Sequence, residues 1–142
     1  MSTKIVPYLL YADCAAALDW LSRAFGFEET LRYAGEQGYV SHAEMRFGDA
    51  FFYMGDPGDD YRNPKELGAE TVGIYVEMDD DVDAHHDRAK AAGAEIVDPP
   101  ADQEYGHRRY IATDPEGHKW FFSQVTADVA PEDWGATSGP AL

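Results

Sequence analysis

Apolar and polar positions follow the same order twice along the chain. Residues 5–11 form a nearly continuous apolar run, and residues 14–25 then place apolar side chains three and four positions apart. The first pattern predicts a strand covered on both faces, and the second predicts an amphipathic helix. Residues 71–78 and 82–92 repeat this order. Extended segments follow each helix, so each half is predicted to be βαβββ.

Glycines mark the ends of these elements at matching places in the two halves. Gly26 and Gly93 follow the predicted helices, and Gly48 and Gly117 fall in tight turns between the last extended segments of each half. Glycine suits such positions because it adopts positive φ without a steric penalty. The nearly equal offsets between these glycines support an internal repeat.

The proposed boundaries divide the chain into one domain, residues 1–126, and a tail. The first module covers about residues 4–56, a loop rich in glycine and proline covers 57–70, and the second module covers 71–126. Residues 127–142 form the predicted C-terminal tail, whose Trp134 is expected to dock on another surface. The expected fold is α+β, with two tandem βαβββ modules forming a curved mixed sheet around a shared cavity.

Charge and cysteine content restrict the class of protein. The 142 residues carry a net charge of −16, which repels phosphate backbones and anionic lipid surfaces. No segment approaches the ~18 consecutive apolar residues of a membrane span, and the first residues lack the apolar run of a signal peptide. The single cysteine, Cys14, rules out an intramolecular disulfide and is expected to be buried. We therefore expect a cytoplasmic protein that binds neither nucleic acid nor membranes.

The most specific motif lies in residues 105–124, from Tyr105-Gly-His-Arg-Arg-Tyr to Trp120-Phe-Phe-Ser-Gln. Together with residues 11–21 and 42–49, it resembles the vicinal oxygen chelate superfamily, the group of glyoxalases, bleomycin resistance proteins and extradiol dioxygenases. The resemblance covers about residues 4–126 and is closest to uncharacterised bacterial glyoxalase-like proteins. It implies a fold and a small-molecule site, but a fold does not by itself name a reaction.

Metal-using members of this superfamily take one His and one Glu from each half to hold a divalent ion. The resemblance places these four positions at Val6, Phe52, Thr71 and Phe121, none of which can bind a metal ion. We therefore expect neither a metal nor another cofactor. Phe52 and Phe121 are expected instead to face each other and line an aromatic cavity.

Six residues form the predicted ligand-binding set: Tyr8, His42, Phe52, Tyr105, Arg108 and Phe121. His42 and Glu44 occupy alternate positions of a predicted strand, so their side chains share one face and are candidate catalytic residues for acid–base chemistry. The competing interpretation of this pair is an exposed structural hydrogen bond. For Arg108, which matches a Gly-x-Arg pattern of the superfamily, the competing interpretation is a structural ion pair.

The remaining helical and turn histidines are expected to be structural or exposed. His85 and His86 are adjacent on the second predicted helix, so their side chains diverge by about 100° and cannot chelate one ion together. Both are expected at the surface. His118 follows the predicted turn 114–117 and is expected to pack against it.

The first functional hypothesis is a metal-independent protein that sequesters an aromatic or cationic drug or metabolite. The alternative is an enzyme of the superfamily, a lyase, isomerase or dioxygenase, that uses either His42 and Glu44 or a divalent metal. Such a metal would need unconventional ligands, namely His42, Glu44, Glu77 and His107. A third possibility is an interaction module whose cavity is filled by its own side chains. We expect a homodimer, because curved half-sheets leave apolar surface to cover.

Overall fold

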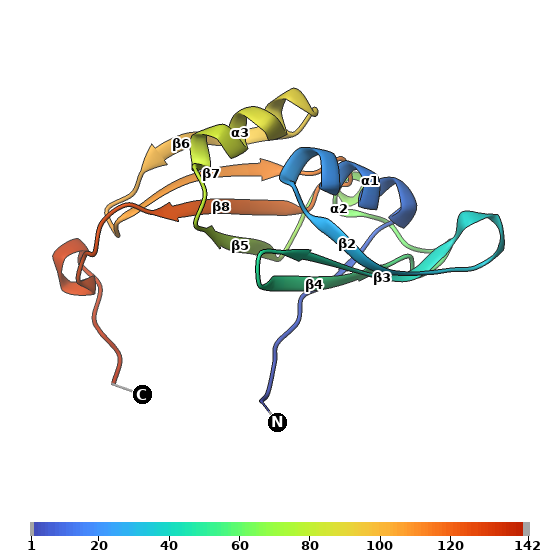
Figure 1. The fold of residues 1–142 in the computed structure, drawn as a ribbon, viewed down its shortest axis with the longest axis horizontal. Helices are drawn as coiled ribbons and strands as arrows, with labels where there is room; N and C mark the ends of the chain where they lie inside the picture. Colours follow the sequence, from blue (N-terminus) through green and yellow to red (C-terminus); the bar gives the residue numbers. More distant parts are fainter. Residues whose placement is uncertain (1, 141–142) are drawn as a thin grey trace.

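The computed structural model describes residues 2–140, which form two four-stranded sheets with two main helices on one side of them (Figure 1). The first module contains β1 (Tyr8–Leu10), α1 (Cys14–Phe25), β2 (Glu28–Ala34), β3 (Val40–Phe47) and β4 (Ala50–Gly55). The second contains β5 (Gly73–Met78), α3 (Val82–Ala91), β6 (Glu95–Asp102), β7 (His107–Thr113) and β8 (Lys119–Val125). The predicted α+β fold of two tandem βαβββ modules is confirmed.

The two sheets have the same internal topology. Sheet 1 has the strand order β1-β4-β3-β2, and sheet 2 has the order β5-β8-β7-β6. In each sheet the first strand of the module pairs parallel with the last strand, and the other pairs are antiparallel. The repeat in the sequence is therefore a repeat of strand order and direction. The sheets remain separate and do not close into one barrel.

Polar side chains cap the starts of both main helices. Asp13 accepts a hydrogen bond from the backbone amide of Ala16 at 3.0 Å, and Asp81 accepts from the first amides of α3. Gly26 ends α1 with a φ of 76°. These caps satisfy amide groups that have no partner inside the helix. No helix within residues 2–140 is both long and apolar enough to cross a membrane.

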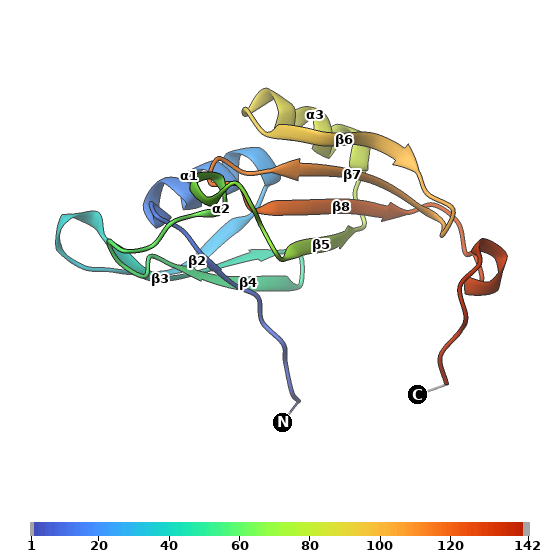
Figure 2. The same cartoon turned by 180° about the vertical axis from the view of Figure 1, so that it is seen from behind.

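Aromatic side chains between the helices and the sheets join the two modules. α1 and α3 contact each other on the same side of the sheets (Figure 2). The ring of Phe25, at the end of α1, lies 4.7 Å from Phe122 and 5.7 Å from Trp120, both on β8. Burial of such large rings contributes about 1.5–3 kcal/mol each. This cluster holds the second module against the first.

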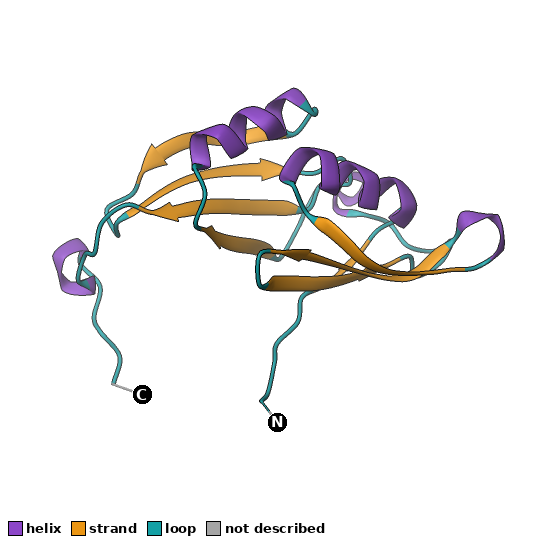
Figure 3. Ribbon diagram, in the orientation of Figure 1, coloured by secondary structure: helices purple, strands orange, loops and turns teal. Residues whose placement is uncertain are grey.

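Two local expectations are wrong. β1 is covered on one face only, since Tyr8 and Leu10 are 48% and 37% exposed while Leu9 is buried. Both helices lie on the same side of the sheets, which leaves the other side of β1 uncovered. The expected loop 57–70 contains a short helix, α2 (Pro64–Leu67) (Figure 3). The side chain of Asn63 caps the start of this helix.

His85 is buried, although the sequence predicts it at the surface. Its Nδ1 lies 2.6 Å from the Tyr110 hydroxyl, and its Nε2 lies 2.8 Å from the carbonyl oxygen of Phe25. Since a carbonyl oxygen only accepts, Nε2 donates to Phe25 and Nδ1 accepts from Tyr110 in the neutral ring. His85 therefore links α3 to the end of α1, a contact between modules that helical periodicity does not reveal.

Candidate functional site

The side of each sheet that faces away from the helices, here called its open face, carries exposed aromatic and polar side chains. Strand alternation produces this arrangement. On β3, Ala43 and Met45 are fully buried, whereas His42 and Glu44 are partly exposed on the open face. The two open faces are the candidate functional site.

On sheet 1, three side chains form a hydrogen-bonded chain. The Tyr8 hydroxyl lies 2.8 Å from His42 Nδ1, and His42 Nε2 lies 2.9 Å from a Glu44 carboxylate oxygen. A carboxylate only accepts, so Nε2 donates to Glu44, and in the neutral ring Nδ1 accepts from Tyr8. Tyr53 flanks the chain, with its ring 5.3 Å from that of His42. The Tyr8 oxygen retains lone pairs for a ligand donor.

On sheet 2, a second tyrosine and histidine make the same kind of contact. The Tyr75 hydroxyl lies 3.0 Å from His107 Nδ1 and 3.3 Å from the Tyr105 hydroxyl, which accepts from Arg109 at 3.2 Å. Partial burial raises the pKa of the Tyr75 hydroxyl to about 12. This hydroxyl therefore stays neutral near physiological pH and remains a hydrogen-bond donor.

Phe121 lies on the open face of sheet 2, where it stacks on Tyr75 with ring centroids 5.8 Å apart. Two cations lie over its ring: the Lys119 ammonium at 5.4 Å and the Arg109 guanidinium at 5.8 Å from the centroid. Arg109 Nε is buried and has no hydrogen-bond partner among residues 2–140. The part of sheet 2 around Phe121 is therefore basic.

The expectation that Phe52 faces Phe121 across a cavity is wrong. Phe52 is only 6% exposed and lies on the helix side of sheet 1, with its ring 5.4 Å from those of Phe27 and Trp120. Register explains this placement, because Phe52 pairs with the fully buried Met45. Tyr53, one position later on β4, occupies the open face instead. Three consecutive aromatic residues at 51–53 give no local signal of which one points inward.

Arg108 also lies away from the open faces. It donates to Asp83, at the start of α3, at 3.0 Å and to Asp102 at 3.2 Å. These contacts match the competing interpretation of a structural ion pair. Arg109, the next residue on β7, lies on the open face, where it contacts Tyr105 and Phe121.

The potential metal ligands among residues 2–140 do not form a metal site. Within residues 2–140, no three His, Cys, Asp or Glu side chains lie close enough together to hold a metal ion. His42 and Glu44 belong to sheet 1, whereas Glu77 and His107 belong to sheet 2. The four alternative ligands therefore do not converge within the chain.

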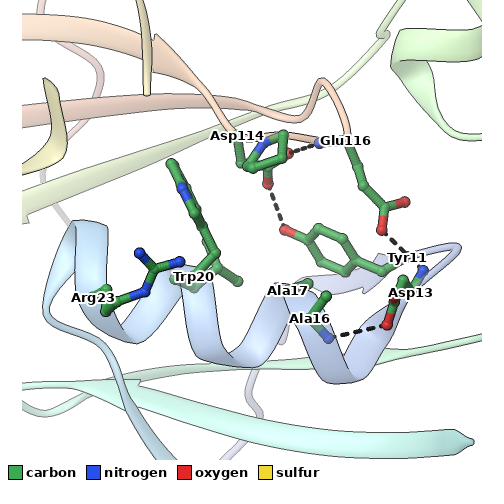
Figure 4. A pocket seen from close by; sticks show the side chains of 10 residues that line it. Tyr11, Asp13, Ala16, Ala17, Trp20, Arg23, Asp114 and Glu116 are labelled. Carbon is green, nitrogen blue, oxygen red and sulfur yellow. Dashed lines mark hydrogen bonds between the residues drawn. The ribbon is translucent and has the colours of Figure 1, made fainter. Parts of the chain in front are cut away.

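A cavity of about 330 Å³ lies on the helix side, between α1 and the turn 114–117 (Figure 4). Trp20 and Arg23 lie at one end of it, and Tyr11, Asp13 and Glu116 lie at the other. Ala16 and Ala17 contribute little side-chain volume, which leaves the space open.

The carboxylates of this cavity are already occupied by protein donors. Asp114 accepts from the Tyr11 hydroxyl at 2.6 Å and from Trp120 Nε1 at 3.1 Å. Glu116 accepts from the backbone amides of Ala12 and Asp13, at 2.6 and 3.0 Å. Burial raises the pKa of Tyr11 well above its usual value, so Tyr11 remains a donor. These groups attach β1 and α1 to the turn, and we assign them a structural role. His118 packs in the same region, as expected, with its ring 4.6 Å from that of Tyr11.

The strand order and the position of the helices define a protein built from two tandem βαβββ modules. A family model described as "Glyoxalase/Bleomycin resistance protein/Dioxygenase superfamily" matches residues 4–122. The chain belongs to this superfamily, which confirms the resemblance identified from the sequence.

Relatives extend over most of the chain. The uncharacterized proteins Mb0911c of Mycobacterium bovis and Rv0887c of Mycobacterium tuberculosis are each 34% identical over 128 residues, covering 87% of this chain and 84% and 75% of theirs. The crystal structure of TioX from Micromonospora sp. ML1 is 34% identical, with a TM-score of 0.70 over 90% of this chain and 100% of that chain. A glyoxalase/bleomycin resistance protein/dioxygenase from Nocardioides shares the fold at 19% identity and a TM-score of 0.64, covering 100% of this chain and 92% of that one.

Proposed function

We propose that the chain is a metal-independent protein that binds and sequesters a small aromatic or cationic molecule on its open faces. One observation carries the proposal: each open face combines exposed aromatic rings with a hydrogen-bonded tyrosine–histidine pair. Tyr8 and Tyr75 remain 48% and 42% exposed although each belongs to such a pair. Aromatic rings with a few placed polar groups are the usual lining of small-molecule sites.

The ligand-contacting residues of this proposal differ from the predicted set at two positions. Tyr8, His42, Tyr105 and Phe121 lie on the open faces and are retained. Tyr53 and Tyr75 take the places of Phe52 and Arg108, which lie on the helix side. The aromatic rings would stack on the ligand, and the Tyr8 and His42 pair would orient it through hydrogen bonds.

A homodimer is part of the proposal. The open face of sheet 1 and its edges expose large side chains on three strands: Tyr8, Leu10, Leu31, Tyr33 and Phe51. A second copy that covered this surface would convert an open face into an enclosed site, and small-molecule sites usually enclose most of the ligand surface. Sedimentation velocity tests this point, since a species of 15.8 kDa, the mass of one chain, would reject it. A cytoplasmic location also belongs to the proposal and is supported by the single free Cys14.

A thermal-shift screen with cationic and neutral aromatic dyes tests the binding function. Proflavine, ethidium and berberine are suitable cationic probes, and coumarin is a neutral one. We expect at least one probe to raise the Tm of the native protein and to have a weaker effect on Tyr8→Ala. If no probe shifts the Tm, or if Tyr8→Ala responds as the native protein does, the open face of sheet 1 is not the binding site.

The hydrogen bonds that link Tyr8, His42 and Glu44 favour one second candidate function, that of a metal-free enzyme that uses acid–base chemistry. Glu44 fixes the ring of His42, and Tyr8 is the hydroxyl at the exposed end that would exchange a proton with a substrate. In this case His42→Ala would abolish turnover and leave the Tm nearly unchanged. If the protein only sequesters its ligand, neither the native protein nor His42→Ala would show turnover, and His42→Ala would bind the ligand more weakly.

A further inference from the structure

The C-terminal segment after β8 is attached to one end of sheet 2. The backbone amides of Thr126 and Ala127 both donate to the carbonyl oxygen of Gly106, at 2.8 and 3.1 Å. Gly106 has a φ of +87°, and a Cβ at this position would collide with the Ala127 carbonyl oxygen. A glycine is therefore needed where the segment leaves the sheet.

This attachment brings Trp134 to the open face of sheet 2. Trp134 ends a short 3-10 helix, η2 (Pro131–Trp134), and its ring centroid lies 5.8 Å from that of Tyr105. Figure 1 shows η2 beyond the end of the sheet, next to the strand ends of β7 and β8. Trp134 therefore docks on a surface of its own chain, beside Tyr105.

Aromatic rings surround a shallow pocket of about 410 Å³ at this end of the sheet. The ring of Tyr105 lies 4.9 Å from that of His107, and the hydroxyls of Tyr105 and Tyr75 are 3.3 Å apart. The lining comprises Tyr75, Glu77, Tyr105, His107, Trp134 and the apolar residues Val129 and Pro131. Three of these rings are electron-rich: Tyr75 on β5, Tyr105 next to Gly106, and Trp134 in the tail.

Glu77 supplies the only acidic group in this lining. It lies two positions after Tyr75 on β5 and therefore on the same face. Its carboxylate has no hydrogen bond or ion pair with any other side chain in the described part of the chain. Arg109 adjoins the pocket, since it donates to the Tyr105 hydroxyl, but neither Arg109 nor Lys119 is among the lining residues, and both cations lie over the ring of Phe121. The pocket therefore pairs electron-rich rings with an unpaired negative charge.

We infer that this pocket is a subsite for an organic cation, a quaternary or protonated ammonium group held over Trp134, Tyr105 and Tyr75 and balanced by Glu77. Aromatic rings attract such cations through the negative faces of their π systems, and tryptophan is the strongest of them. The inference deepens the proposed function and rests on it in one respect, since the cation is taken to be one end of the ligand of the open faces. Trp134 is then a specificity-determining residue that lies outside the two modules.

Choline and 3,3-dimethyl-1-butanol form a matched pair of probes, because they have the same shape and differ in charge. The tryptophan Nε1–H signals of the full chain provide the readout in ¹H–¹⁵N NMR, with Trp134→Phe to assign them. Trp20 and Trp120 are internal controls, since their Nε1–H groups are bonded to Ala92 and Asp114 on the helix side. We expect choline to shift the Trp134 signal saturably and the neutral alcohol to leave it in place. Equal shifts with both probes, or equal shifts of all three tryptophans, would overturn the inference.

Variants separate the charge from the rings. Glu77→Gln and Glu95→Gln change the net charge equally, but Glu95 is an exposed residue of β6 outside the pocket. We expect Glu77→Gln to weaken choline binding about threefold or more and Glu95→Gln to leave it unchanged, while Trp134→Leu weakens it by a similar or larger factor. Equal affinities of the two glutamine variants would reject the role of Glu77. If Tyr8→Ala leaves the choline response intact and no aromatic probe binds the native protein, the subsite stands and the proposed function fails.

Discussion

The Tyr8 hydroxyl lies 2.8 Å from His42 Nδ1, although β1 and β3 are not neighbouring strands. β4 runs between them, so the two side chains meet above that strand. The second module repeats the arrangement, since Tyr75 on β5 reaches His107 Nδ1 on β7 across β8, at 3.0 Å. The internal repeat therefore places one polar pair on each open face, with aromatic rings beside it.

Removal of the His42 ring tests whether the sheet 1 pair binds ligand. His42→Ala is expected to weaken binding of a probe that stabilises the native protein by about fivefold to tenfold, the loss typical of one hydrogen bond. Isothermal titration calorimetry measures this change. Ser41→Ala, at the adjacent position of β3, is the matched control and should bind normally. An unchanged affinity of His42→Ala would remove this residue from the site.

The neighbouring residues Phe51 and Phe52 test the register of β4. Phe52→Ala is expected to lower the free energy of unfolding by about 3–5 kcal/mol, because it empties a packed core position. Phe51 is 37% exposed, so Phe51→Ala is expected to cost about 1 kcal/mol or less. Urea denaturation of both variants provides the comparison. Similar costs at the two positions would contradict the described register.

His85 makes stability depend on pH in a defined direction. Burial lowers the pKa of His85 below its usual value, so the unfolded chain takes up this proton at a higher pH than the folded chain. The stability contributed by the neutral ring is full above about pH 6.5, the usual histidine pKa, and is lost as the pH falls through the lower folded-state value. Urea denaturation over this range is expected to show a steeper decline for the native protein than for His85→Gln.

NMR titration of the native protein provides a check that does not depend on how the variant folds. The titration midpoint of the His85 ring signals should lie below pH 6.5, because burial lowers the pKa of this ring. A transition at or above the usual histidine pKa would contradict the buried, neutral ring bonded to Phe25 and Tyr110.

Cys14 is expected to be unreactive in the folded protein. It is 1% exposed, and burial raises the pKa of its thiol to about 12, so almost no thiolate forms near neutral pH. Mass spectrometry after treatment with iodoacetamide should show little alkylation of the native chain and complete alkylation in guanidinium chloride. Rapid alkylation without denaturant would show that α1 does not bury this residue.

Local sequence signals predicted the elements of the fold but not the direction in which several side chains point. Asp13 and Gly26 act within one helix, so their capping roles follow from residue type and position. Phe52 and Arg108 were misplaced because which face of a strand is buried depends on the packing of α1 and α3 onto the sheets. That packing is a contact between distant parts of the chain.

The same limit applies to the candidate site. Alternation alone placed His42 and Glu44 on one face, but the contact between Tyr8 and His42 depends on strand order and crosses a third strand. His85 looks like a surface residue on its own helix and is buried only because the end of α1 packs against it. Trp134 could be recognised as an unusual residue in a polar tail, whereas its position over Tyr105 depends on the attachment at Gly106.

The central claim is that the open faces bind a small molecule without a metal ion. The most direct test is the affinity for a stabilising aromatic probe, measured by calorimetry on the same preparation before and after exhaustive dialysis against EDTA, with metal content determined at both stages. The account predicts equal affinities at negligible metal content. A stoichiometric metal in the first preparation, together with loss of binding after its removal, would contradict the account.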